Sequence, residues 1–508
     1  MTTGGRWSHC STTHASRARR ATGRDVQQRG RVMVNDGPGI GVALSGGGHR
    51  AALFNLGALL YLIDARKGPQ LRSVSSVSGG SLTNAYLGHA VDLSSVDPET
   101  VWAHARALAT QVARRGTLWA APVTYLYLGS IGALLALAAT VSFVGAGWWV
   151  AAVWVIVIAL CGWLAQQRSV VVARALDTTL FHRRPLTSMN SVVSHVLCAT
   201  DLQMGQAVFF SSNFVNSWRT GWGTPGDLRI ARAVQASAAL PGAFSVVSLP
   251  LSRFGLPQQG VPDRQAPQCF KLLDGGVYDN MGSEWLLELD DRLKGSPPPG
   301  LQPVGEVIVV NASAGDDVVS RPSVTLPLIG EVRSLLAVKD VMYRQTTAVR
   351  RRLLNTRYRI SRDDDLGNIG PNAGVLQEAL RGTTIQINRS PFAIADAYKS
   401  GSDAIAARAR AAIVTLGEEN RAFWAGEADR NRRVKTTLSR VSQARAESLI
   451  RHGYILSMVN CHVLLDYPLV GIPTDEKTRQ LVTPDPLRRR RIDSPESPPH
   501  LQPTVPPQ

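Results

Sequence analysis

The sequence predicts an α/β protein with a mainly parallel central sheet, interrupted by a two-helix hairpin. Short apolar runs, such as residues 40–44 and 306–311, alternate with helical patterns, as is typical of parallel strands covered by helices. Three of these runs end in glycine-rich turns. Between Arg115 and Arg168 the chain has no charged side chain, and this stretch is long enough for two apolar helices.

Both ends of the chain carry clusters of arginines. The chain has 508 residues and a formal net charge of +17, with RARR near the start and RRRR at residues 488–491. Because both ends lack periodic apolar residues, we expect disordered tails over residues 1–36 and 473–508. Such tails are either simply solvated or bind anionic lipid headgroups. No nucleic acid is expected as a partner, since no known module or aromatic interleaving accompanies the basic residues.

The cysteines indicate a reducing compartment. They are odd in number, widely spaced and without a C-x-x-C pair, so they suggest neither a disulfide framework nor a zinc site. The N-terminus has basic residues but no following apolar run of the signal-peptide type. We expect no metal and no cofactor. The five cysteines are Cys10, Cys161, Cys198, Cys269 and Cys461.

The uncharged stretch predicts a transmembrane hairpin over residues 117–167. YLYLGSIGALLALAATVSFV supplies one span, WWVAAVWVIVIALCGWLA the other, and GAG at residues 145–147 the turn. Aromatic residues lie at both ends, and arginines flank only the open end. The positive-inside tendency therefore places the termini and the folded part in the cytoplasm. A re-entrant hairpin and a hairpin buried in a soluble core are the alternatives.

The other elements follow in a regular order, in folded segments at residues 37–116 and 168–460. Two strand–turn–helix units come first, with turns at SGGG and SVSGG. After the hairpin we expect two strands around Met204-Gly205, a short helix ended by Pro241-Gly242, a strand that ends at Asp274 and the buried strand EVIVV. Long helices over roughly residues 400–458 complete the ordered part.

The second turn has the composition of a nucleophile elbow. A serine acts as a nucleophile when it is exposed, has a base within reach and has donors for the oxyanion. In SVSGG the exposed residue is Ser78, and Ser76 and Gly80 are the small residues two positions before and after it. Ser76 departs from the G-x-S-x-G pattern, and a flexible turn is the alternative interpretation.

The other two turns supply donors and a base. Gly46, Gly47 and Gly48 expose backbone N–H groups at a helix N-terminus, which suits an oxyanion hole or a phosphate cradle. The loop is not a P-loop, because no G-K-[ST] follows, and its early glycines precede the strand, unlike those of a dinucleotide fingerprint. Asp274, before two glycines, is one candidate base, and His49 is the other.

Together these motifs resemble those of the patatin-like phospholipase family, which has a G-G-G-x-[RK] loop, a G-x-S-x-G elbow and a D-G-[GA] motif in this order. The resemblance covers roughly residues 38–312, apart from the hairpin. It implies a three-layer fold and a Ser–Asp dyad without histidine, in which Ser78 attacks the ester carbonyl and Asp274 takes its proton. It also implies that amides of residues 46–48 hold the oxyanion and that Arg50 steadies the loop or a phosphate.

The sequence thus predicts a membrane-anchored serine lipid acyl hydrolase of the phospholipase A or lysophospholipase type. Its expected partners are a membrane lipid substrate and the bilayer, whereas the acyl position and the oligomeric state are not specified. A catalytically silent membrane scaffold or lipid-binding protein of the same fold is the alternative. The intact Ser78, Asp274 and triple glycine favour the enzyme, since a binding module does not need all three.

Overall fold

The computed structural model describes residues 38–145, 147–256, 267–313, 327–362 and 379–484. The tail predicted at residues 1–36 lies outside these residues, as does the predicted C-terminal tail from residue 485 onward. Within them the strands are β1 (Ile40–Leu44), β2 (Leu71–Val77), β3 (Ser194–Asp201), β4 (Gln206–Phe210), β5 (Val215–Ser217), β6 (Gly221–Gly223), β7 (Val247–Pro250), β8 (Cys269–Asp274), β9 (Glu306–Asn311) and β10 (Arg381–Gln386).

The described residues also form helices, which cover both faces of the sheet built by these strands except for α4 and α5. They are α1 (Gly48–Asp64), α2 (Gly79–Ala90), α3 (Pro98–Arg114), α4 (Pro122–Val144), α5 (Trp148–Gln166), α6 (Arg168–Leu176), α7 (Ile230–Ser237), α8 (Gly276–Asp279), α9 (Glu284–Leu287), α10 (Leu289–Leu293), α11 (Pro327–Arg362), α13 (Phe392–Tyr398), α14 (Ala404–Leu416), α15 (Arg421–Arg432), α16 (Gln443–Leu465) and α17 (Asp475–Val482).

The strands form one mixed sheet whose centre is parallel. Its order is β10-β9-β1-β2-β3-β4-β5-β6, and β8 pairs with β3 and β7. All pairings from β10 to β3 are parallel, whereas those among β3 to β8 are antiparallel. The predicted α/β fold with a parallel centre is therefore confirmed. The antiparallel end follows from short connections such as Met204-Gly205, because parallel strands need a longer crossover.

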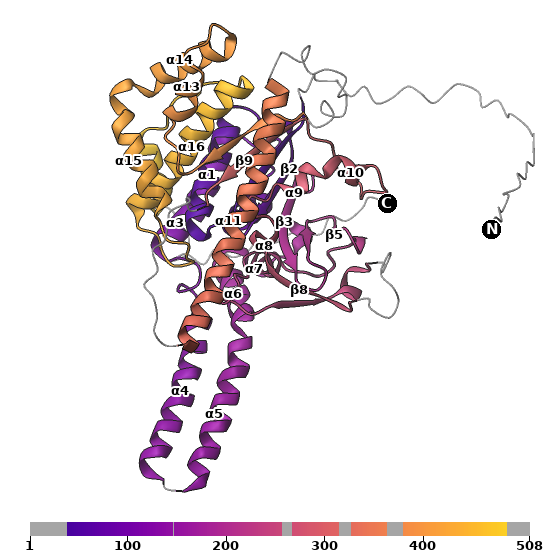
Figure 1. Cartoon of the computed structure of the whole chain (residues 1–508), viewed down its shortest axis with the longest axis vertical. Helices are drawn as coiled ribbons and strands as arrows, with labels where there is room; N and C mark the ends of the chain where they lie inside the picture. Colours follow the sequence, from indigo (N-terminus) through magenta and orange to yellow (C-terminus); the bar gives the residue numbers. More distant parts are fainter. Residues whose placement is uncertain (1–37, 146, 257–266, 314–326, 363–378, 485–508) are drawn as a thin grey trace, which may run out of the picture. The chain divides into compact units, whose positions relative to one another are not determined.

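The sheet and the helices on its two faces form three layers. Val42 and Leu44 of β1 belong to one apolar cluster with residues of α1, α2, α3 and α16. Ala43 belongs to a second cluster, which contains residues of α9, α10 and α11. Successive side chains of a strand point to opposite faces, so each cluster is the core beneath one helical layer. Figure 1 shows α11 crossing on one side of the strands and α1 and α16 on the other.

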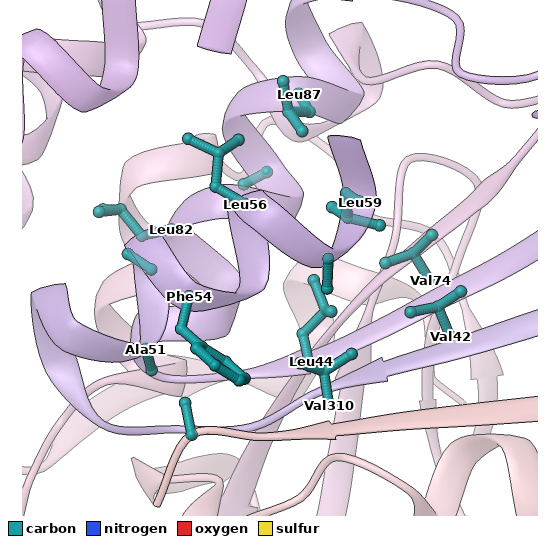
Figure 2. Packing of buried hydrophobic residues seen from close by; sticks show 14 of the residues in the cluster. Val42, Leu44, Ala51, Phe54, Leu56, Leu59, Val74, Leu82, Leu87 and Val310 are labelled. Carbon is teal, nitrogen blue, oxygen red and sulfur yellow. The ribbon is translucent and has the colours of Figure 1, made fainter. Parts of the chain in front are cut away.

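The first core layer fixes the start of α1 and α2 above the sheet. In Figure 2, Phe54 and Leu59 of α1 lie over Val42, Leu44 and Val74 of the strands. Leu82 and Leu87 of α2 also belong to this fully buried cluster; the figure further labels Ala51, Leu56 and Val310. Each buried aliphatic side chain contributes roughly 1.5–3 kcal/mol. The turns that precede α1 and α2 are thus held at the same end of adjacent parallel strands.

Two helices depart from the sequence expectation. The helix α11 was not predicted, because its sequence is polar and its apolar positions are sparse; Leu354 and Tyr358 nevertheless bury against the sheet. The helix α17 lies within the predicted C-terminal tail. The Thr474 side chain caps it by accepting from the Lys477 N–H, and Leu481 and Val482 are buried. Few apolar residues are enough to stabilise α17, because this helix packs against α3 and α16.

The predicted hairpin is a pair of helices whose apolar side chains are mostly exposed. Both α4 and α5 are long and apolar enough to cross a membrane, and only 6% of the most apolar stretch of each is buried. Phe143 is 91% exposed and Trp148 is 84% exposed at the turn. Figure 1 shows the two helices extending side by side away from the sheet. Their exposure distinguishes them from the core helices of a soluble domain.

Candidate active site

Ser78 and Asp274 lie together because of how three strands meet. The strand β2 pairs with β3 up to Val77 opposite Cys198. The strand β8 then takes over the same edge of β3, with Asp274 opposite Ala199, since β4 occupies the other edge at this position. The end of β2 and the end of β8 therefore meet at consecutive residues of β3. Both side chains line one cavity of about 320 Å³, called here the Ser78 pocket.

Ser78 occupies a strained turn between β2 and α2. Its backbone has φ 52° and ψ −116°, a conformation that non-glycine residues rarely adopt. Ser78 is half-buried, whereas Val77, Gly79 and Gly80 are buried. The turn thus raises one side chain from a closed surface into the pocket, which is the arrangement of a nucleophile elbow.

The two glycines after Ser78 are required by close backbone contacts. A Cβ atom on Gly79 would lie 2.0 Å from the Gly48 carbonyl oxygen, and one on Gly80 would lie 2.5 Å from the Leu44 carbonyl oxygen. No side chain fits at either distance. The elbow therefore packs directly on the glycine-rich loop, which brings Ser78 to the backbone of that loop.

Ser76, which departs from the expected glycine, is part of a buried hydrogen-bond network. Its hydroxyl donates to the Val196 carbonyl oxygen at 3.0 Å. It accepts from the Ser81 hydroxyl at 3.1 Å and from the Asn84 amide at 2.8 Å. The position is small, as an elbow demands, and its hydroxyl also ties β2 to β3 and α2.

Ser237, at the end of α7, connects the two sides of the site. Its hydroxyl accepts from the Ser78 backbone N–H at 3.0 Å and donates to the Cys198 carbonyl oxygen at 2.6 Å. Its carbonyl oxygen accepts from the Gly275 N–H at 3.1 Å. One fully buried residue therefore bonds the backbone of the elbow and the backbone that follows Asp274.

The glycine loop offers two unused backbone donors. The Gly46 N–H donates to the Asn280 carbonyl oxygen at 3.0 Å, so it is not available to an oxyanion. Among the described residues, the N–H groups of Gly47 and Gly48 have no such acceptor. Both residues have positive φ, 141° and 59°, which their lack of a side chain permits. Gly47 lines the Ser78 pocket and Gly48 follows it in the chain, so these two amides are the ones left to hold an oxyanion, and the role stays a prediction.

Arg50 braces this loop. Its Nε donates to the Ala312 carbonyl oxygen at 3.0 Å and its Nη1 to the Val434 carbonyl oxygen at 2.6 Å. Burial lowers the pKa of Arg50 to about 10. Both of these bonds hold the start of α1 against other segments, and the role predicted for Arg50 in steadying the loop stays a prediction. The residue also lines the Ser78 pocket.

His49, the alternative base, is placed differently. It is 1% exposed and is not among the residues that line the Ser78 pocket. Its ring nitrogens bond the Ser439 carbonyl oxygen at 2.7 Å and the Thr117 hydroxyl at 3.1 Å. Burial lowers its pKa to about 4. These contacts make His49 a buried link between α1 and the segment that leads into the hairpin.

Asp274 is buried and oriented by its own turn. It is 2% exposed, and its Oδ1 accepts from the Gly276 N–H at 2.8 Å. Tyr343 of α11 lies above this turn, where a Cβ atom on Gly276 would be 2.5 Å from its ring. Burial and the neighbouring Asp274 carboxylate raise the pKa of Tyr343. The phenol therefore stays protonated beside the carboxylate.

The pocket includes residues that sequence patterns did not identify. Asn280 and the α11 residues Asp340, Tyr343, Arg344 and Thr347 line it, and no motif marks them. Arg350 fixes α11 over the site through an ion pair with Glu284. Ser237 lies in the short helix predicted before Pro241-Gly242, and no motif gives its hydroxyl a role. The full lining is Gly46, Gly47, Arg50, Ser78, Leu240, Asp274, Asn280, Ser313, Asp340, Tyr343, Arg344, Thr347 and Thr436.

The comparisons with known proteins identify a family domain in part of the chain. Residues 42–284 match the family described as Patatin-like phospholipase, which confirms the resemblance drawn from the three motifs. A search of curated proteins found no match.

Two solved structures are similar to the chain. Human GIVD cytosolic phospholipase A2 aligns with 15% identity and a TM-score of 0.34, covering 55% of this chain and 46% of that chain. The chain thus spans about half the length of that human protein. VipD from Legionella pneumophila aligns with 10% identity and a TM-score of 0.21, covering 83% of this chain and 92% of that chain.

Proposed function

Because residues 42–284 form a patatin-like phospholipase domain, we propose that the chain is a membrane-anchored serine hydrolase that cleaves acyl esters of lipids. The family match supports lipid hydrolysis as the class of activity. One observation carries the finer assignment: Ser78, on a strained elbow, lines the same pocket as the buried Asp274 and the glycine loop. Those are the parts that an acyl transfer to serine needs.

In the proposed reaction, Ser78 and Asp274 act as nucleophile and base. The Ser78 Oγ attacks the ester carbonyl while Asp274 takes the hydroxyl proton. The N–H groups of Gly47 and Gly48 stabilise the oxyanion that forms on the carbonyl oxygen. When the tetrahedral intermediate collapses, Asp274 returns the proton to the leaving alcohol. Water then attacks the acyl group on Ser78 while Asp274 takes a proton from it, and Asp274 returns that proton to the Ser78 Oγ as the fatty acid leaves.

The hairpin α4–α5 is proposed to be the membrane anchor. Its apolar side chains are exposed, and no charge interrupts residues 116–167. Arginines flank the open end, which by the positive-inside tendency leaves the folded part in the cytoplasm. An anchored enzyme meets its lipid substrate at high effective concentration. Membrane lipid is therefore the proposed substrate, of phospholipid or lysophospholipid type.

Hydrolysis by purified variants tests the proposed function. Asp274→Asn keeps the shape of the side chain and its acceptor for the Gly276 N–H, but removes the base. We expect release of fatty acid from mixed lipid vesicles to fall at least about 100-fold, the range of a lost general base. The matched control is Asp291→Asn, at an exposed pair with Lys294. Full activity of Asp274→Asn at equal expression would reject Asp274 as the base.

A further inference from the structure

A second cavity lies where the hairpin joins the folded part of the chain. It has a volume of about 400 Å³ and is formed by α6, the start of α7 and the turn at Leu251–Phe254. Four arginines and two aspartates line it, and none of its residues lines the Ser78 pocket. We call it the arginine pocket, with Arg174, Arg229, Arg232, Arg253, Asp177 and Asp227 as its charged residues.

The arginine pocket lies next to the open end of the hairpin. The helix α6 begins at Arg168, directly after α5 ends at Gln166, and Arg174 follows about two helical turns later. Figure 1 shows α6 next to the end of α5. The Ser169 N–H donates to the Ser245 hydroxyl at 3.2 Å, which fixes the start of α6 on the folded part. If α5 spans a bilayer, the pocket lies near the depth of the lipid phosphates.

The charges of the arginine pocket do not balance. Arg229 pairs with Asp177 at 3.3 Å and Arg253 pairs with Asp227 at 2.7 Å. Among the described residues, the other two arginines, Arg174 and Arg232, have no carboxylate partner. One of these, Arg232, donates instead to the neutral Gln235 side chain at 3.0 Å.

The surroundings of Arg232 disfavour the charged form of its side chain. Burial lowers its pKa, and the charge of Arg253 lowers it further. A partly buried charge without an opposite charge beside it is costly, and an anion bound in the pocket would remove this cost. Arginine is well suited to phosphate, because its planar N–H groups match two phosphate oxygens.

Asp177 indicates that a ligand of the arginine pocket needs a hydrogen-bond donor as well as a negative charge. It is 7% exposed and begins the π-helical turn Asp177–Phe181. Its Oδ2 accepts from Arg229, but its Oδ1 is buried and has no hydrogen-bond partner among the described residues. A carboxylate oxygen accepts hydrogen bonds only, and this one is closed to solvent, so a donor such as a ligand hydroxyl group reaches it once the side chains around it move.

We propose that the arginine pocket binds a phosphate ester that carries a free hydroxyl group, of the kind found in the phosphoglycerol headgroup of an anionic lipid. The phosphate lies against Arg232 and Arg174, and the hydroxyl donates to Asp177. Apolar side chains of Val170, Ala173 and Leu228 line the same cavity and fit the carbon atoms of the ester. The site is separate from Ser78, so the inference does not depend on the proposed hydrolysis.

Titration calorimetry on the full chain in a non-ionic detergent tests this site. A Ser78→Ala background prevents turnover of the probes. The probes are dioctanoyl phosphatidylglycerol, dioctanoyl phosphatidylcholine, glycerol 1-phosphate and methyl phosphate. We expect the glycerol lipid to bind more tightly than the choline lipid, and glycerol 1-phosphate to bind more tightly than methyl phosphate. Competition by glycerol 1-phosphate would identify soluble esters as a source of ligand, whereas binding of the lipid alone would identify the bilayer.

Variants then assign the binding to the pocket. Arg232→Gln and Arg174→Gln are each expected to weaken binding of the glycerol lipid by about tenfold or more, as for a lost charged hydrogen bond. Arg174 is exposed, so its variant keeps the test valid if Arg232→Gln does not fold. The control Arg115→Gln removes one exposed charge near the same end of the hairpin and is expected to change affinity less than about threefold. Equal losses in all three variants, unchanged binding in both pocket variants, or no preference over the choline lipid would each overturn the proposal.

Discussion

Ser78 directly follows β2 and Asp274 ends β8, and these two strands pair with consecutive residues of β3: Val77 lies opposite Cys198, and Asp274 lies opposite Ala199. The whole hairpin lies between the two residues in sequence, yet it leaves this junction undisturbed because it begins after α3 and ends before β3. The sheet thus fixes the two side chains independently of the insert.

Ser237 is expected to be a positioning residue. Ser237→Ala removes the acceptor of the Ser78 N–H and the donor to Cys198, while Asp274 remains in place. We expect kcat for lipid hydrolysis to fall about 10- to 100-fold, the equivalent of a lost buried hydrogen bond, with KM unchanged. The matched control is Ser457→Ala, which loses one buried bond to Gly453 in α16. Equal loss of kcat in both variants would make the effect of Ser237 merely structural.

Gly79 is expected to tolerate no side chain. In Gly79→Ala the new methyl group would overlap the Gly48 carbonyl, so the elbow or the glycine loop must shift. We expect a loss of stability of about 1–3 kcal/mol together with loss of activity. Gly132→Ala in α4 is the control, since nothing lies within 4 Å of its added Cβ. Thermal unfolding in detergent compares the two, and an active, equally stable Gly79→Ala would contradict the packing described.

The hairpin is expected to be required for stable membrane association. A variant that replaces residues 122–166 by a flexible glycine–serine linker removes both apolar helices while it leaves the His49–Thr117 contact in place. After an alkaline carbonate wash, the full chain should stay with the membrane fraction and the variant should appear in the supernatant. A variant that remains in the washed membranes would show that another part of the chain is the main anchor.

The fold is expected to lose stability as the pH falls from about 6.5 to about 4. Burial lowers the pKa of His49, His195 and His452 from 6.5 to about 4 each, so the unfolded chain binds protons first. Stability is therefore complete above pH 6.5 and decreases below it. Each histidine contributes about 2 kcal/mol to the loss between pH 7 and pH 5.

A histidine variant tests this assignment. His452→Gln should reduce the difference in unfolding free energy between pH 7 and pH 5 by about 2 kcal/mol, as measured by denaturant titration. His182→Gln, at an exposed position, serves as the control and should leave that difference unchanged. If the two variants lose equal stability on acidification, buried histidine does not account for the pH dependence.

The parts of the site that are local in sequence could be predicted, and those that depend on tertiary contacts could not. Strand–turn–helix patterns located β1, β2 and α2 and placed Ser78 on the elbow between β2 and α2. Asp274 was recognisable because two glycines follow it, and both approach backbone or Tyr343 closely.

The remaining site residues carry no local signal. Tyr343 and Asp340 come from α11, whose polar sequence hides its contact with the sheet, and Ser237 acts through a single hydroxyl. In sequence the amide of Gly46 is equivalent to those of its neighbours, whereas in the structure it donates to the Asn280 carbonyl oxygen. The tail expected from residue 473 onward contains α17, because packing against α3 and α16 compensates for its short apolar pattern.

The most direct test of an activated serine in this pocket is labelling by a fluorophosphonate probe, comparing the detergent-solubilised chain with its Ser78→Ala variant. A serine with a nearby base and oxyanion donors reacts with such a probe, whereas an ordinary hydroxyl does not. We predict labelling of the unmodified chain and none of Ser78→Ala, with thermal unfolding unchanged. Labelling that persists in Ser78→Ala, or a folded chain that is not labelled, would contradict the account and favour a catalytically silent lipid-binding protein.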